Sequence, residues 1–385
     1  MLSPPNASSP STERMAAAVR EWKKPVGLSG YGCFGPLGDA RETARALNEG
    51  RVALRLAPVH GEQGGEAAPI ALVDSAMHDA PPRWETHART VRGRLPGGGW
   101  GSPGRPVIVT SSNFGIDQLV AYKTEQDRER LLFAQPHTSA ARLAEIFGWT
   151  AEPTLISHAC VSSSLGLLHA CELVENGLAE EALVFSYDFV SPFVSAGFAA
   201  LKILNSGFPA PFADRSWGAI GLGDAMAWAV VSSKPAPFRL RAAASRNEMF
   251  HMTANNPDAS GFETVAEAMA RVAAGRKLWV KGHGTGTLDA GRMESGAFSR
   301  RFPEAPLVSW KGSLGHTLGT CGLFETVIAL EAIAGGKVPG TVGSEAPAFS
   351  GNVALDSFSP DGCNGFISFS NAFGGAHVAH FIDHD

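Results

Sequence analysis

Cys160 is the residue whose surroundings most favour chemistry. It lies between an apolar run at 154–156 and a segment at 161–168 that has helical spacing, so we predict a strand, a sharp turn and a helix. Backbone N–H groups and the positive end of the helix dipole converge at such a turn, which favours thiolate and lowers the pKa. The turn also leaves an N–H free to stabilise an oxyanion. Cys160 is therefore a candidate nucleophile; the alternative is a buried cysteine that serves as a small apolar residue.

Two histidines follow apolar runs of the same kind. His283 lies in the segment Gly-His-Gly-Thr-Gly-Thr, directly after a predicted strand. His316 comes after another short strand, Lys311 and a glycine turn, and we expect it to open a helix that continues through 324–333. Either histidine alone is more often a structural residue. A cysteine at a turn combined with two such histidines indicates a catalytic site.

Further motifs, all in one order along the chain, match a single enzyme family. They are the segments 26–38, 211–215, 250–258 and 368–375, with Gly-His-Gly-Thr-Gly-Thr and Lys-x-x-x-Gly-His-x-x-Gly-x-x-Gly between the last two. On these motifs the chain resembles the β-ketoacyl-acyl carrier protein synthases, the condensing enzymes of the thiolase fold. The likeness extends over 26–382, and the chain resembles a divergent type II member.

The resemblance implies an α/β fold of two similar halves packed as five layers (αβαβα). We expect a mobile tail over 1–25 that is mildly helical around 13–22, a half with the nucleophile over 26–232, and a half with both histidines over 233–385. The residues themselves favour a covered, mostly parallel sheet, because short apolar runs alternate with amphipathic helical segments. These helical segments are 40–49, 140–147, 165–176 and 262–274.

The resemblance also implies a mechanism. Cys160 would take an acyl group from a carrier protein, and His283 and His316 would stabilise the enolate left when a malonyl thioester loses CO₂. Lys311 would fix the position and charge balance of His316. The backbone N–H groups of Cys160 and Phe373 would stabilise the tetrahedral oxyanion.

Other residues are expected to support this site. Thr285 and Thr287 either offer hydroxyls to the amides of a phosphopantetheine arm or simply shape their loop. Glu325 would orient the site, and Asn371 would support it. We expect no bound cofactor and no metal, because the substrates would be carried on the phosphopantetheine of acyl carrier protein and no His or Cys spacing favours a metal site.

Three departures from the family pattern favour a role in secondary metabolism. The chain has Gly221-Leu-Gly223 where the family has Gly-Glu-Gly, and Gly291 where it has Asp. The loop 371–375 is two residues shorter than in the family. We therefore expect a static pocket entrance with Phe373 packed near Cys160. An acyltransferase that does not decarboxylate, and a non-catalytic partner subunit, remain alternative hypotheses.

Composition limits the partners and the compartment. A net charge of −5 gives no reason to expect nucleic acid, and no stretch reaches the length of a membrane span. Five cysteines without a C-x-x-C pair favour a reducing, cytoplasmic setting. The apolar run 183–190 is too hydrophobic for an exposed edge. We therefore expect it to pair across a dimer axis, with an identical chain or with a related ketosynthase-like subunit.

Overall fold

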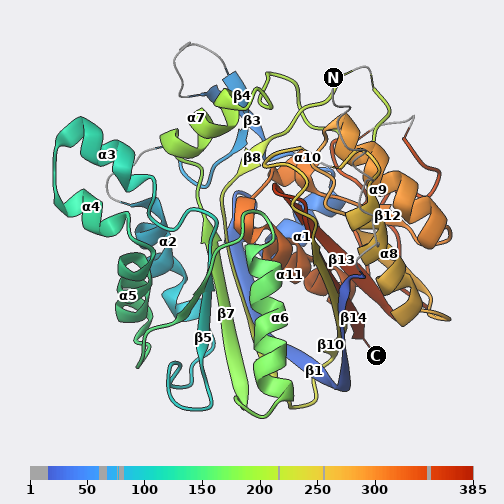
Figure 1. The fold of residues 1–385 in the computed structure, drawn as a ribbon, viewed down its shortest axis with the longest axis horizontal. Coiled ribbons are helices and arrows are strands. Elements are labelled where there is room, and N and C mark those ends of the chain that lie inside the picture. The colour runs from blue at the N-terminus through green and yellow to red at the C-terminus, as the bar shows by residue number, and fades with distance from the viewer. Residues whose placement is uncertain are drawn as a thin grey trace, which may run out of the picture.

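A sheet of eleven strands runs through the molecule (Figure 1), and a second sheet of three strands, with the order β3-β4-β8, lies beside it in the part of the chain that the structure describes. The computed structural model describes residues 16–59, 67–75, 77, 82–215, 217–254, 256–344 and 348–384. Its strands are β1 Ala18–Gly35, β2 Gly38–Asp39, β3 Arg55–Pro58, β4 Ala67–Ala71, β5 Val107–Thr110, β6 Thr154–Ile156, β7 Glu181–Asp188, β8 Leu222–Gly223, β9 Ala225–Ser232, β10 Phe238–Asn247, β11 Leu278–Lys281, β12 Leu307–Val308, β13 Gly365–Ala372 and β14 Ala376–His384. Its α-helices are α1 Ala40–Asn48, α2 Arg83–Val91, α3 Gln118–Glu125, α4 Glu129–Phe133, α5 Pro136–Phe147, α6 Ser162–Glu175, α7 Pro192–Ala200, α8 Ser260–Val272, α9 Leu288–Arg301, α10 Lys311–Leu314 and α11 Cys321–Ala334, and its 3₁₀ turns are η1 Arg92–Arg94 and η2 Leu318–Thr320.

The strand order repeats along the sheet. The neighbours run β12-β11-β13-β14-β10-β1-β9-β7-β5-β6. The first half contributes β1, β5, β6, β7 and β9 to this order, and the second half contributes β10 to β14. In both halves, counted in chain order, the strands run first, fifth, fourth, second and third from the centre of the sheet to its edge. The two halves therefore share one topology, although the boundary predicted at residue 232 stays a prediction.

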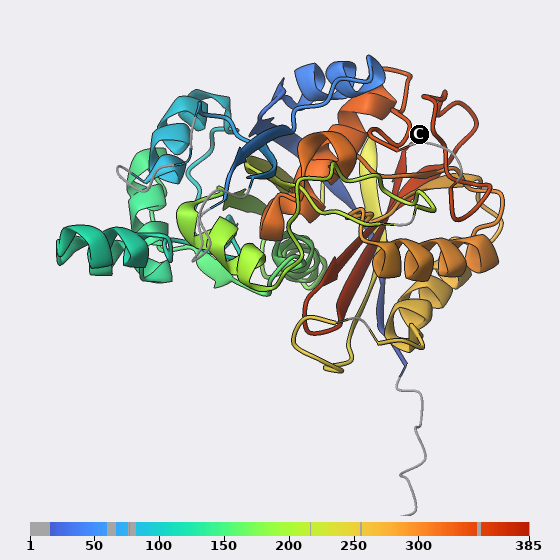
Figure 2. The ribbon, with the colours of Figure 1, turned by 90° about the horizontal axis from the view of Figure 1, so that it is seen from above.

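Two helices lie between the halves of the sheet. Helix α6 contacts β5, β7 and β14, and it packs on α11, which contacts β9 and β13. Helices α2 and α5 cover the outer face of the first half, and α8 and α9 cover that of the second. Figure 2 shows these outer helices at opposite ends of the molecule. The five layers predicted from the sequence are present. The prediction of a mostly parallel sheet is wrong, because the strands around the centre, β7, β9, β1, β10, β14 and β13, pair antiparallel, and the parallel pairs of this sheet lie towards its two edges.

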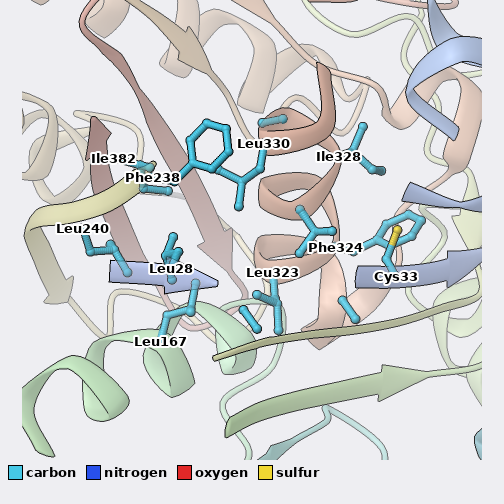
Figure 3. Packing of buried hydrophobic residues seen from close by; sticks show 14 of the residues in the cluster. Leu28, Cys33, Leu167, Phe238, Leu240, Leu323, Phe324, Ile328, Leu330 and Ile382 are labelled. Atoms are coloured by element: carbon cyan, nitrogen blue, oxygen red, sulfur yellow. The ribbon is translucent and has the colours of Figure 1, made fainter. Parts of the chain in front are cut away.

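Strand β7 shows how the layers form. Leu183 and Phe185 pack in the outer cluster with α2 and α5, whereas Val184 packs in the central cluster with α6 and α11. Both faces are thus buried, which explains the continuous apolar run. The prediction that this run forms a dimer edge is wrong, because β7 lies between β5 and β9 and the edge strand is β6. Figure 3 shows part of the central cluster around α11.

The predicted mobile tail is wrong from residue 18 onwards. Strand β1 begins at Ala18 and pairs antiparallel with β10, and Trp22 is buried in the central cluster. The backbone N–H of Lys23 donates to Glu175 Oε1 at 2.8 Å. The partners of this segment are more than a hundred residues away, so the local pattern around 13–22 indicated a helix where, over 18–22, β1 forms instead. Residues 1–15 of the predicted tail lie outside the described residues.

Candidate active site

Cys160 sits at the turn between β6 and α6, as the sequence predicts. Ala159, immediately before it, has a φ of 44°, a strained value for a residue with a side chain. Ser162 braces the turn, since its Oγ accepts from the N–H of His158 at 2.8 Å and donates to the carbonyl of Ala159 at 2.7 Å. The turn therefore holds the Cys160 side chain where the two halves meet.

His316 lies directly against the cysteine. Its Nε2 is 3.1 Å from the Sγ of Cys160. The backbone of His316 is held by β8: its N–H donates to the carbonyl of Gly221 at 2.7 Å, and its carbonyl accepts from the N–H of Gly223 at 3.1 Å. The prediction that His316 opens a helix is wrong, because it forms this bridge and α11 begins only at Cys321.

His283 completes a pair of imidazoles. The rings of His283 and His316 meet edge to face, with centroids 5.0 Å apart and planes at 85°. The loop of His283 is tied to the buried carboxylate of Glu294, which accepts from the N–H of His283 at 2.7 Å and from that of Gly284 at 3.1 Å. Cys160, His283 and His316, separated by 156 residues of chain at most, thus form one buried cluster.

A buried charge network lies beneath the histidines. Lys311 pairs with Oε1 of Glu325, as expected for residues that support the site. Lys281, which the sequence analysis did not single out, approaches Oε2 of the same carboxylate at 2.8 Å and donates to the carbonyl of Phe369 at 3.0 Å. Each of the three charged side chains is at most 2% exposed. One carboxylate is therefore shared between two ammonium groups.

Burial dominates the electrostatics of the catalytic candidates. It raises the pKa of Cys160, and the nearby thiol of Cys321 adds to this, whereas Lys311 opposes it. The expectation of a lowered thiol pKa is therefore wrong for the resting protein, because desolvation of the thiolate outweighs the helix dipole. Burial also holds the pKa values of His283 and His316 well below 6.5, with Lys311 as the next cause. The resting pair is thus a neutral thiol beside a neutral imidazole.

The pKa values of the surrounding carboxyl and ammonium groups depend on their charged or hydrogen-bonded partners as well as on burial. Burial alone would lower the pKa of Lys311, but Glu325 beside it raises the pKa above its usual value. Burial would raise the pKa of Glu325, but Lys281 and Lys311 hold it below its usual value. Burial raises the pKa of Glu294 to about 7, against the N–H groups that it accepts from. Glu325 is therefore ionised in the resting site, whereas Glu294 titrates near neutrality.

A third buried carboxyl group near the site, Asp188, lies behind the cysteine turn and was also missed. It accepts from Ser111 Oγ at 2.8 Å and from Thr320 Oγ1 at 3.1 Å. It accepts from the backbone N–H of Ser112 at 3.1 Å as well. Burial raises its pKa to about 6, while its hydrogen bonds oppose the rise. An aspartate at the end of an apolar strand was the only available signal.

The loop that carries Phe373 is a tight hairpin. Ala372 pairs with Ala376, so Phe373, Gly374 and Gly375 form the turn, and both glycines have positive φ. Ala372 packs in the same apolar cluster as Cys160. The ring centroids of Phe373 and of Phe198 in α7 lie 6.1 Å apart. The hairpin therefore borders the cysteine, and the oxyanion role of the Phe373 N–H stays a prediction.

The remaining predicted residues have internal partners. The hydroxyls of Thr285 and Thr287 lie 3.1 Å apart and hydrogen-bond to each other. The Oδ1 of Asn371 lies 2.9 Å from Nδ1 of His377. Binding of phosphopantetheine by the two threonines stays a prediction.

Two of the departures from the family pattern have structural reasons. The segment Gly221-Leu-Gly223 lies against the backbone of His316, and a Cβ at Gly223 would collide with the carbonyl oxygen of Leu314. A Cβ at Gly291 would lie 2.9 Å from the ring of Phe349. Leu222 is buried in an apolar cluster with Leu318. Close packing thus occupies the places of both acidic residues.

Metal and membrane signals are missing from the part of the chain that the structure describes. There, no group of three or more His, Cys, Asp or Glu side chains is placed to hold a metal ion. None of its helices combines the length and the apolar character needed to cross a bilayer. All five cysteines are free thiols.

Comparison with known sequences gives consistent matches. A family model described as "Beta-ketoacyl synthase, C-terminal domain" matches residues 238–345. The ketoacyl synthase alpha subunit of the tetracenomycin polyketide synthase of Streptomyces glaucescens is 31% identical over 216 residues, 50% of each chain. The 3-oxoacyl-[acyl-carrier-protein] synthase 2 of Coxiella burnetii is 29% identical over 216 residues, 49% of this chain and 51% of that protein. The chain thus spans about half the length of these curated relatives.

Solved structures match over a greater length. A ketosynthase in complex with its chain length factor, from Xenorhabdus doucetiae, superposes with a TM-score of 0.79 at 21% identity. The match covers 94% of this chain and 98% of that one. At this identity the likeness shows the fold, and the predicted thiolase fold is confirmed.

Proposed function

We propose that this chain, which is similar to β-ketoacyl synthases in sequence and in fold, catalyses the decarboxylative Claisen condensation of an acyl thioester with malonyl-acyl carrier protein. The product would enter a fatty-acid-like or polyketide pathway, including polyenes. The single observation that carries the proposal is the contact of His316 Nε2 with Cys160 Sγ, with His283 completing the cluster. This set contains a nucleophile and two imidazoles for a developing negative charge, and one of these imidazoles, His316, also serves as the base.

The first half-reaction transfers the acyl group to the enzyme. As the Sγ of Cys160 attacks the thioester carbonyl, its proton passes to Nε2 of His316, and a new C–S bond forms. The C–S bond to the phosphopantetheine then breaks, and its thiolate takes the proton from His316. A neutral imidazole in hydrogen-bond reach is the base that a thiol with a raised pKa requires.

The second half-reaction forms the new carbon–carbon bond. The malonyl thioester loses CO₂, and the electrons of the broken bond form an enolate whose oxygen accepts a hydrogen bond from His283 and, from the tautomer that carries its proton on Nε2, a second one from His316. The enolate carbon attacks the acyl carbonyl of the acylated Cys160. The tetrahedral intermediate then expels the Cys160 thiolate, which takes one proton from the solvent, because the condensation consumes one proton overall.

The partners and the setting belong to the same proposal. Acyl carrier protein delivers both substrates on phosphopantetheine, and the protein itself holds no cofactor and is an acyltransferase by class. It works as a homodimer or as a heterodimer with a ketosynthase-like subunit, as the chain length factor complex of the structural neighbour suggests. Free cysteines support a cytoplasmic location.

Intact-protein mass spectrometry tests the proposal. The protein is incubated with a panel of acyl carrier proteins and then with malonyl-acyl carrier protein. We expect an acyl mass on the enzyme that disappears in the second step, together with CO₂ and a β-ketoacyl carrier protein. The Cys160→Ala variant should keep its fold and gain no mass. An acyl mass on that variant would refute the nucleophile, and acyl transfer to an alcohol or amine without CO₂ would support the acyltransferase alternative.

A further inference from the structure

Lys281 is a buried cation with no role in the reaction as described so far. It is the last residue of β11 and is fully buried. Its Nζ makes two contacts, with Glu325 Oε2 at 2.8 Å and with the carbonyl of Phe369 at 3.0 Å. A buried lysine is rare unless it is paired, so its partners indicate why it is retained.

These contacts connect the segments that carry the site. Two residues after Lys281, the chain reaches His283. Glu325 also binds Lys311, the first residue of the short helix that precedes His316. Phe369 belongs to β13, which leads into the hairpin at Phe373. One ammonium group thus fixes three segments of the site relative to one another.

The charges of the network do not cancel. Lys281 and Lys311 are two cations, and Glu325 supplies one anion. Glu294 also acts on Lys311 by its charge, but burial raises the pKa of Glu294 to about 7, so it is only partly ionised near neutrality. A positive surplus therefore remains beneath the imidazoles.

The buried titratable groups that face this surplus come from several elements. They are Glu294 of α9, His283 of the loop after β11, His316 before η2, Cys321 and Glu325 of α11, Lys311 of α10, and His377 and His380 of β14. Glu294 and Glu325 supply the negative charge on the side of the two lysines, and Asp188 of β7, whose pKa burial raises to about 6, supplies negative charge behind the Cys160 turn.

We propose that Lys281 is a positioning residue of the histidine pair, which clamps β11 to Glu325 and Phe369 and adds a positive charge that, together with burial and Lys311, keeps His283 and His316 unprotonated. An imidazolium could not take the proton of Cys160, so a neutral ring at His316 is a condition of the first step. The low pKa values of both rings have burial as their first cause, with Lys281 among the charges that add to it. The reaction part of this inference rests on the proposed function.

A purely structural role is the competing explanation. In that case Lys281 matters only as a hydrogen-bond donor to Glu325 and Phe369. Lys281→Gln keeps a donor and removes the charge, whereas Lys281→Arg keeps the charge. Lys281→Met removes both and leaves an apolar side chain that needs no partner, so it serves as a second charge-removing variant if the glutamine variant is unstable.

Carbethoxylation by diethylpyrocarbonate, mapped by mass spectrometry, tests the inference without a measurement of enzyme activity. The reagent modifies neutral imidazole, so the rate at each histidine, divided by the rate at the same histidine at pH 7.5, reports protonation separately from the slow access that burial imposes. We expect flat rates at His283 and His316 between pH 5.5 and 7.5 in the unmodified protein and in Lys281→Arg. In Lys281→Gln and Lys281→Met we expect the rates at pH 5.5 to fall by about threefold or more, because removing a nearby positive charge favours imidazolium.

The inference would be overturned if the carbethoxylation rates of His283 and His316 depended on pH in the same way in all four proteins. It would also be overturned if, in the parent protein, these rates decreased as the pH was lowered from 6.5. CO₂ release from malonyl-acyl carrier protein provides a second measurement. The pH at which CO₂ release declines on the acidic side should be higher in Lys281→Gln than in the parent protein, and Lys281→Arg should restore the parent value. If the histidine profiles shift but no variant or parent protein releases CO₂, the proposed function fails and the role of Lys281 stands.

Discussion

The imidazoles of His283 and His316 meet edge to face, 5.0 Å apart between ring centroids, and only His316 contacts the sulfur of Cys160. The two histidines follow the same local sequence pattern, namely a strand and then a glycine-containing turn. Their surroundings differ, because Glu294 holds the loop of His283 and β8 holds the backbone of His316. This asymmetry leads to the first prediction.

The two histidines should separate the half-reactions. His316→Ala should slow acylation of Cys160 by about 10²-fold, because it removes the base, whereas His283→Ala should slow it less than about tenfold. Both variants should lose most of their CO₂ release. Stopped reactions analysed by intact mass give the first rate, and labelled CO₂ gives the second. Decarboxylation at the parent rate in His283→Ala would remove that residue from the enolate site.

Gly223 should be intolerant of any side chain. A Cβ at this position collides with the carbonyl oxygen of Leu314, so Gly223→Ala must push β8 away from the backbone of His316. We expect a loss of about 1–3 kcal/mol in unfolding free energy and slower acylation. Urea unfolding and acylation rates measure both effects.

Gly197 in α7 provides the matched control for this substitution. It is exposed, and a Cβ there has no heavy atom within 4 Å. Gly197→Ala should stabilise the protein slightly, because alanine is the better helix former. Equal effects of the two substitutions would show that the packing of β8 on His316 does not matter.

Glu294 should make stability depend on pH. Its pKa rises from 4.5 to about 7 on folding, so the folded state favours the protonated acid. The stability that this group contributes is fully present below pH 4.5 and is lost as the pH rises through 7. Relative to Glu294→Gln, the parent protein should therefore lose roughly 2–3 kcal/mol between pH 4.5 and 7.5.

Denaturant unfolding of both proteins at several pH values tests this expectation. Glu152→Gln, which changes an exposed carboxyl, is the control and should follow the parent curve. Parallel curves for the parent and Glu294→Gln would contradict the buried, protonated state.

Phe373 should act more as packing than as a gate. The three-residue turn is held at Gly375, whose carbonyl accepts from the N–H of Glu248 at 3.0 Å, and the Phe373 ring packs near Phe198. We expect Phe373→Ala to change the preference among acyl donors by less than about tenfold. Phe198→Ala should give a change of similar size. A large switch in preference, or loss of acyl-first kinetics, would show that Phe373 is a working gate.

The sequence predicted what depends on local patterns. The turn at Cys160 follows from an apolar run, a cysteine and a helical segment that are contiguous, and all of them form. The part of β1 before Val26 was missed because the partners that bury Trp22 lie far along the chain. Lys281 was missed because a lysine at the end of an apolar strand indicates a solvated end, and only the distant Glu325 makes it a buried pair.

The dependence on distant parts of the chain also explains two other errors, one about the run 183–190 and one about the pKa of Cys160. The run 183–190 is apolar because both of its faces are buried, and local sequence does not distinguish such a strand from an edge covered by a partner. The raised pKa of Cys160 has a similar origin, since the sequence shows the helix dipole but not how far the site is closed to water.

Strand β1 has a mechanical consequence for the whole molecule. At Gly27 and Leu28 it pairs with β10 on one side and with β9 on the other. The half that carries Cys160 and the half that carries both histidines are thus joined by one continuous ladder of backbone hydrogen bonds. A hinge between them would have to break that ladder, so substrates must reach the cysteine through movements of surface loops, and the two halves should unfold in a single cooperative transition.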